Sequence, residues 1–334
     1  MSPSDTRRRL LLGATGFGGI SLLGVSPAMA AEPPPETTRI RLVHAPAICL
    51  APQYLAEDLL RLEGFTDIRY EEMVTGAPVQ VIEARKADIT MDAAPASLYS
   101  LDAGNPVVVL AGIHAGCYEL IGNDRIHAIR DLKGKTIAIM AVGGGDHVLV
   151  SSMLAYVGVN PRTEVRWIME NTFDTMRLFM EGKADAIMGF APQPQELRER
   201  GIGHVIVNTA LDRPWSQYFC CVVTASREFV AKYPVATKRA LRAFLKAADI
   251  CAADPEAAAR MLAERKYETR QNISLEVLKT FPYRRWRDAN PEDTLRFHAL
   301  RLHEVGMIKS TPDRIIANGT DWRFFNELRR ELKA

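Results

Sequence analysis

Polar, small and aromatic side chains gather where the predicted strands end and loops lead into helices. Imidazole, amide and hydroxyl groups donate hydrogen bonds, carboxylates accept them, and glycine lets a ligand approach the backbone. This pattern indicates a small-molecule site without covalent chemistry. In the first half of the chain the candidates are His44, Cys49, Thr75, Gly76, Asp92, Ala94 and His114. In the second half they are Gly144, Gly145, Asp146, His147, Asn171, Thr172, Phe190 and Gln193.

Most candidates also have a structural interpretation. A histidine at a strand end is more often structural than ligand-binding, and Asp92 and Asp146 could cap helices. The glycines 143–145 could form a flexible turn as well as a ligand cradle. No arginine occurs in the six candidate loops, at 44–49, 75–76, 92–95, 141–147, 171–172 and 189–193, although a strongly anionic ligand usually attracts one. We therefore expect a ligand that carries a donor group, zwitterionic or heterocyclic.

Motifs for catalysis and for cofactors are missing. The sequence has no Gly-x-Ser-x-Gly and no His-Glu-x-x-His, and residues 143–146 lack the spaced third glycine of a dinucleotide-binding loop. We therefore expect no catalytic residue, no cofactor and no metal. The five cysteines show no Cys-x-x-Cys spacing, and Cys220 and Cys221 are adjacent. They predict thiols buried as small hydrophobes and no disulfide framework.

An internal repeat places the candidates on equivalent elements. An offset of 97 positions superposes Thr75 on Thr172, Pro95 on Pro192 and the tripeptide 86–88 on 183–185, and it places 40–43 on 137–140 without a gap. Each copy reads as β-α-β-α-β-α. The strands are predicted at 39–44, 67–73 and 88–91, and again at 135–140, 165–169 and 185–188. Alternating strands and helices predict an α/β fold with mostly parallel sheets.

Two copies predict two lobes that face each other across a cleft. Ligands of open parallel sheets bind beyond the carboxyl ends of the strands, which is where the candidate residues lie. We divide the chain into a leader at 31–38, a first lobe at 39–122, a second lobe at 123–217 and a helical return to the first lobe at 218–334. The chain is then expected to cross between the lobes near 121–128 and near 213–218, forming a two-segment hinge.

Residues 1–30 resemble a twin-arginine signal peptide. Arg7, Arg8 and Arg9 precede a short, glycine-diluted apolar run, and residues 28–30 offer a small-x-small cleavage site. We expect export by the twin-arginine machinery and a soluble, monomeric periplasmic protein without a lipid anchor. Removal of this leader leaves equal numbers of basic and acidic side chains, so no nucleic-acid partner is expected.

Four segments resemble one family of binding proteins. They are His44-Ala45-Pro46 followed by 51–56, and the stretches 85–89, 129–135 and 182–186. Together they are similar to periplasmic solute-binding proteins for aliphatic sulfonates, taurine, nitrate and pyrimidine precursors of thiamine. The resemblance implies the two-lobed periplasmic-binding-protein fold of the second topological type, each lobe a mixed sheet flanked by helices. It also implies a small-molecule ligand and, as partners, the permease and ATPase of an ABC transporter.

Two alternatives stay open. The same superfamily contains a synthase of the thiamine pyrimidine, which carries a cysteine cluster after the third strand of its second lobe. Residues 189–193 occupy that position here and contain no cysteine. A periplasmic sensor domain with the same two lobes would have the same sequence pattern.

Overall fold

The strands of the two lobes form separate sheets. The computed structural model describes residues 32–73, 76–169 and 172–332, without the side chains of 172–174. Residues 34–334 form one compact unit. Its strands are β1 (Arg39–His44), β2 (Asp67–Glu72), β3 (Ile89–Ala93), β4 (Val107–Ala115), β5 (Tyr118–Gly122), β6 (Thr136–Ile139), β7 (Arg166–Met169), β8 (Ala186–Phe190), β9 (His204–Asn208) and β10 (Phe219–Ser226).

The two lobes repeat one strand order. In lobe one, β1 pairs in parallel with β2, and β10 lies antiparallel between β3 and β4. A backbone hydrogen bond from Asp88 to Arg41 joins the start of β3 to β1. Lobe one thus has a two-stranded sheet, β2-β1, which this bond links to a three-stranded sheet, β3-β10-β4, and the spatial order is β2-β1-β3-β10-β4. Lobe two has the order β7-β6-β8-β5-β9, with β5 as the antiparallel member. This arrangement confirms the predicted fold class.

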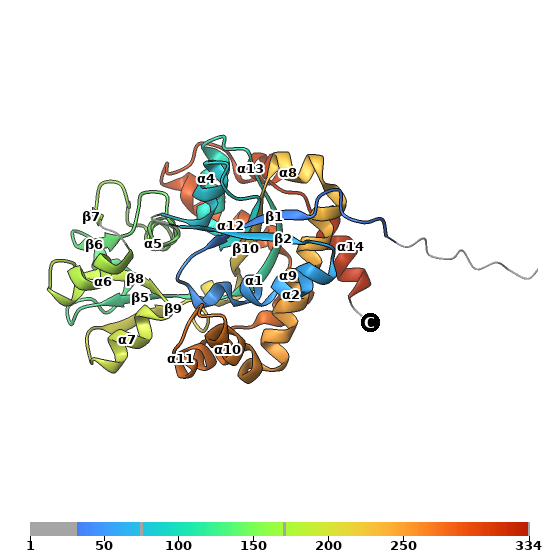
Figure 1. Ribbon diagram of the computed structural model, residues 1–334. Coiled ribbons are helices and arrows are strands. Elements are labelled where there is room, and N and C mark those ends of the chain that lie inside the picture. The colour runs from blue at the N-terminus through green and yellow to red at the C-terminus, as the bar shows by residue number, and fades with distance from the viewer. Residues whose placement is uncertain (1–31, 74–75, 170–171, 333–334) are drawn as a thin grey trace, which may run out of the picture. The chain divides into compact units, whose positions relative to one another are not determined.

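The antiparallel strand of each sheet comes from the other half of the chain. β5 follows β4 of lobe one but is hydrogen-bonded to β8 and β9 in lobe two (Figure 1). The first crossing thus lies between Ala115 and Tyr118, earlier than the predicted 121–128, and residues 118–122 belong to lobe two. Sequence placed β5 wrongly because its apolar pattern does not say which sheet it joins. The return lies between Asn208 and Phe219, a span that includes the predicted 213–218.

Helices cover both sheets. Lobe one holds α1 (Ala51–Leu55), α2 (Glu57–Leu62), α3 (Pro78–Glu83) and α4 (Ala94–Asp102), and lobe two holds α5 (Gly145–Tyr156), α6 (Thr172–Met180) and α7 (Gln193–Glu199). Short 3-10 turns occur at Ile48–Leu50, Ile129–Leu132, Trp215–Gln217 and Tyr283–Arg287. Pro95 lies in the first turn of α4, where its missing N–H costs nothing.

The remaining chain is helical. It forms α8 (Arg227–Lys232), α9 (Pro234–Ala253), α10 (Pro255–Glu264), α11 (Gln271–Thr280), α12 (Pro291–Glu304), α13 (Pro312–Gly319) and α14 (Arg323–Glu331). α9 packs on α1 and α2, and the turn at Tyr283–Arg287 packs on β4, so this tail covers lobe one as expected. α12 also contacts α5 of lobe two. Among the described helices, none is both long and apolar enough to cross a bilayer.

The aspartate of the repeated Lys-Ala-Asp tripeptide accepts a hydrogen bond from the first strand of its lobe. The Asp88 carboxylate accepts a hydrogen bond from the Arg41 N–H at 2.8 Å, and the equivalent Asp185 accepts one from the Thr136 N–H at 3.0 Å. These matching hydrogen bonds relate the first strands, β1 and β6, by an offset of 95 residues. The third strands, β3 and β8, are related by an offset of 97 residues. The gapless superposition of 40–43 on 137–140 is wrong by two residues, because lobe two has a longer connection between its first two strands.

Candidate ligand-binding cleft

A small cavity lies where the strand-end loops of both lobes meet. It encloses about 30 Å³. Lobe one contributes Ala45, Ala47, Cys49, Leu50, Met73, Gly76, Ala77, Pro78, Asp92, Ala93 and Cys221, lobe two contributes Tyr118, Met140, Gly145 and Phe190, and Cys117 lies at the crossing between them. The structure thus joins five of the six predicted loops around one space. Thr75 and Asn171 lie outside the described residues, as does the side chain of Thr172, the first residue of α6.

Asp92 is the acidic group of the cavity. Its side chain is 3% exposed, and its two oxygens accept hydrogen bonds from the Val79 N–H at 2.8 Å and the Ala93 N–H at 2.6 Å. Val79 lies in the first turn of α3, so Asp92 caps this helix. Burial raises the pKa of Asp92 to about 7. The carboxyl group can therefore change its charge near neutral pH.

The glycine run 143–145 brings α5 close to the cavity. A Cβ on Gly145 would lie 2.5 Å from Tyr118 Oη and 3.0 Å from Ala93 Cβ, so only glycine fits there without a shift. Gly144 caps α5 through its backbone. Asp146 does not cap the helix with its side chain; Oδ2 accepts from the Met140 N–H at 2.7 Å, and burial raises its pKa to about 6.

Three predicted histidines lie away from the cavity lining. His147 Nδ1 accepts from the Gly143 N–H at 3.1 Å, and burial lowers its pKa to about 4. His114 is fully buried in β4, with its ring nitrogens 3.0 Å from the carbonyl oxygens of Cys49 and Gly116. His44 pairs with Glu72 at 2.8 Å beside the rings of Tyr54 and Tyr267. These contacts give each histidine a structural partner and hold the loops around the cavity.

Phe190, Gln193 and Ala94 are the remaining predicted residues, and only Phe190 lines the cavity itself. Its ring lines the cavity and meets the Tyr118 ring edge-on, with centroids 5.7 Å apart. Gln193 lines an adjacent hollow of about 140 Å³ that shares Ala47 and Phe190 with the cavity. Ala94 is buried as the first residue of α4. Sequence reasoning missed Tyr118, Met73 and Met140. No sequence pattern marked Tyr118 as a cavity residue, because it lies on β5, which follows lobe one in sequence but pairs with strands of lobe two.

The cysteines differ from the sequence expectation. Cys117 and Cys220 form a disulfide with Cα atoms 6.3 Å apart, so the prediction of free buried thiols is wrong for this pair. Their separation of 103 residues explains why spacing gave no hint of the bond. Cys49 and Cys221 are free thiols that line the cavity, and Cys251 is a free thiol inside α9.

Polar contacts join the two lobes. The Ile48 N–H of lobe one donates to the Ala191 carbonyl of lobe two at 3.3 Å. Two ion pairs join α7 to the helical tail. Arg270 pairs with Glu196 of α7, and Arg198 of α7 pairs with Glu276 of α11 at 2.9 Å. A drug-sized ligand needs roughly 300 Å³ or more, so the lobes are closed around a space too small for one.

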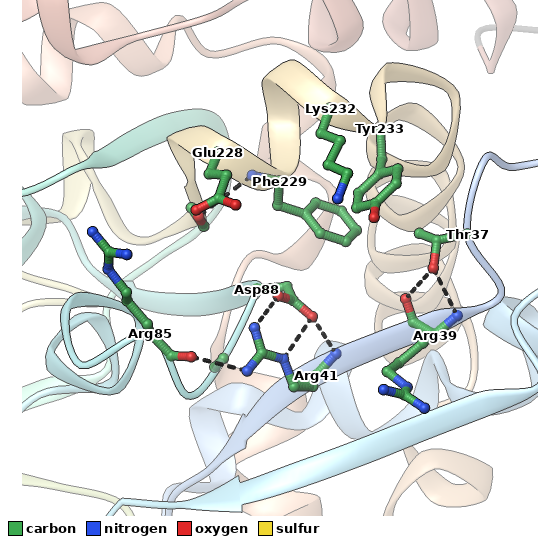
Figure 2. A pocket seen from close by; sticks show the side chains of 11 residues that line it. Thr37, Arg39, Arg41, Arg85, Asp88, Glu228, Phe229, Lys232 and Tyr233 are labelled. Carbon is green, nitrogen blue, oxygen red and sulfur yellow. Dashed lines mark hydrogen bonds and ion pairs between the residues drawn. The ribbon is translucent and has the colours of Figure 1, made fainter.

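Another hollow, of about 310 Å³, is lined by residues at the amino ends of β1 and β3 (Figure 2). Arg39, Arg41, Arg85 and Lys232 make it basic. Arg41 is paired with Asp88 at 2.6 Å, and Arg39 is paired with Asp67 at 2.6 Å, so carboxylates compensate much of the charge. Because it adjoins the amino ends of β1 and β3, it is a poorer ligand site than the cleft.

The fold and the cleft define a two-lobed protein of the periplasmic-binding-protein type. A family profile described as "NMT1/THI5 like" matches residues 67–258, more than half of the chain, and the chain belongs to this family. No curated protein sequence matches the chain.

Three solved structures are similar in fold. The periplasmic nitrate-binding protein NrtA from Synechocystis PCC 6803 has a TM-score of 0.75 and 15% identity, over 90% of each chain. The alkanesulfonate-binding protein SsuA from Xanthomonas axonopodis pv. citri, bound to MOPS, has a TM-score of 0.68 and 16% identity, over 88% of this chain and 100% of that one. A DSZB mutant in complex with biphenyl-2-sulfinic acid has a TM-score of 0.58 and 15% identity, over 88% and 99%.

Proposed function

We propose that this chain is the periplasmic substrate-binding component of an ABC importer. It captures a small organic solute between its lobes and delivers it to a permease. The observation that carries this proposal is one cavity lined by the strand-end loops of both lobes. The likeness in fold to the nitrate-binding and alkanesulfonate-binding proteins supports it. The twin-arginine leader supports export of the folded precursor.

The cavity favours a neutral or weakly basic heterocycle over an oxyanion. Within the described part of its lining no lysine or arginine occurs, whereas an oxyanion usually attracts a bidentate arginine. Asp92 has lone pairs left to accept from an amino group, and the rings of Phe190 and Tyr118 offer apolar faces. An amino-substituted pyrimidine matches this set better than a sulfonate or nitrate does.

Binding then requires the lobes to open and to close again around the ligand. The closed cavity holds about 30 Å³, which is far less than such a ring needs. Closure removes the ligand from water and strengthens its hydrogen bond to Asp92. The ion pairs between α7 and the tail are placed to hold the closed state.

Mass spectrometry of molecules released from gently purified protein tests the proposal directly. A melting screen against aminopyrimidines, sulfonates and nitrate follows. A true ligand at about one hundred times its Kd should raise the Tm by about 5 °C. Asp92→Asn should reduce this shift for an aminopyrimidine.

Two results would contradict different parts of the proposal. Stabilisation by sulfonate or nitrate, unaffected by Asp92→Asn, would refute the ligand class but not the binding role. Absence of any released molecule, together with no stabilisation by any compound, would refute the binding role.

A further inference from the structure

Four of the five cysteines meet beside the cavity. Cys49 lies in the turn after β1, Cys117 at the crossing before β5, and Cys220 and Cys221 on β10. The Sγ atoms of Cys49, Cys117 and Cys221 all lie within 4.8 Å of one another. The Sγ atoms of Cys117 and Cys221 are 3.8 Å apart. All three residues are buried and line the cavity.

An irregular strand places both neighbouring cysteines near Cys117. The register of β10 against β4 shifts on either side of Cys221. Such an irregularity re-aims side chains that would otherwise alternate between the faces of a sheet. Cys220 therefore reaches Cys117 as its disulfide partner, while Cys221 faces the cavity together with Cys49.

We propose that the reduced protein binds one thiophilic d¹⁰ metal ion, such as Zn²⁺ or Cd²⁺, between the sulfur atoms of Cys49, Cys117 and Cys221. A metal–sulfur bond of about 2.3 Å requires sulfur atoms about 3.8–4.0 Å apart in tetrahedral or trigonal geometry. The observed separations therefore need only a small contraction. Met73 and Met140 line the same cavity. Their thioether sulfur atoms are further soft donors of the kind that such ions bind.

The disulfide controls this site, because a sulfur bonded to Cys220 cannot act as a thiolate ligand. A dithiol reductant opens it: two hydrogens pass from the reductant to Cys117 and Cys220, and the reductant becomes a cyclic disulfide. Binding of a divalent ion then releases the three protons of the ligand thiols. The oxidised protein keeps only the thiols of Cys49 and Cys221 at the site. This inference does not rest on the proposed transport role.

Cadmium is a suitable probe because thiolate-to-cadmium charge transfer absorbs in the ultraviolet. Cys220→Ser leaves Cys117 as a free thiol, so this variant should bind one Cd²⁺ per chain without any reductant. Wild-type protein should do so only after reduction. Removing one ligand by Cys49→Ser, Cys117→Ser or Cys221→Ser should weaken binding more than about 100-fold, since loss of a mere outer partner already costs 10–100-fold.

Cys251→Ser is the matched control, because Cys251 is equally buried but lies in α9 outside the cluster. It should leave cadmium binding by the reduced protein unchanged. The proposal is overturned if reduced wild type and Cys220→Ser, both folded by circular dichroism, give no charge-transfer band. It is also overturned if Cys49→Ser and Cys221→Ser bind as tightly as wild type.

Discussion

The ion pairs between α7 and the tail allow closure of the lobes to be weakened without leaving an unpaired charge. Glu196→Gln removes the partner of Arg270 in the other lobe, but Arg270 keeps Glu268 at 3.0 Å. Glu276→Gln removes the corresponding partner of Arg198, which keeps Glu119 at 2.6 Å. The double variant therefore removes the two ion pairs between the lobes and leaves both arginines with a carboxylate partner.

The expected effect follows from the exposure of these pairs. The side chains of Arg270 and Arg198 are 41% and 43% exposed, so each pair contributes about 0.2–1 kcal/mol. Losing both costs the closed state about 0.4–2 kcal/mol, which lowers the ratio of closed to open molecules about 2- to 30-fold. Small-angle scattering of the ligand-free protein should show a larger radius of gyration, and ligand affinity should fall by a similar factor.

A matched control lies within the tail. Glu292→Gln removes one partner of Arg296, which keeps Asp313, and Arg296 is 46% exposed. This variant should change neither the radius of gyration nor the ligand affinity. The reasoning is refuted if the double variant scatters like wild type, or if the control expands the protein as much.

Two further predictions concern stability. Burial raises the pKa of Asp92 from 3.8 to about 7, so the folded protein holds this proton more tightly than the unfolded chain does. The stability that Asp92 contributes should therefore fall as pH rises from about 4 to 7. In urea unfolding, the free energy of unfolding of Asp92→Asn relative to wild type should be a few kcal/mol higher at pH 8 than at pH 5. An equal difference between the two proteins at both pH values would contradict this. Asp185→Ala should cost about 1–3 kcal/mol in urea unfolding, since it leaves the Thr136 N–H without its acceptor. Because Asp185 lies at the amino end of β8, ligand affinity should not change, and a loss of affinity would contradict its scaffolding role.

Local patterns predicted the parts of the fold that local chemistry determines. Alternation of apolar strands with helices gave two β-α repeats, and the rule for parallel sheets placed the strand-end loops around one cleft. This rule placed Gly145, Phe190 and Asp92 in loops that line the cavity. The contact of Asp92 with α3 depends on Val79, which is distant in sequence.

Contacts between distant segments could not be read from the sequence. The bond between Cys117 and Cys220 depends on the crossing and the return of the chain, each in a different half. Tyr118 reaches the cavity only because β5 joins lobe two. The partners of His114 are carbonyl groups, which no side-chain pattern reveals.

The exchanged strands have a consequence for the order of folding. Within the described part of the chain, the strand pairing of β3 and β4 in lobe one runs through β10, which begins at residue 219. During synthesis, the amino-terminal lobe therefore cannot complete its sheet before nearly all of lobe two has been made. A fragment ending at residue 122 would expose unpaired strand edges and should aggregate, so both lobes must mature as one cooperative unit.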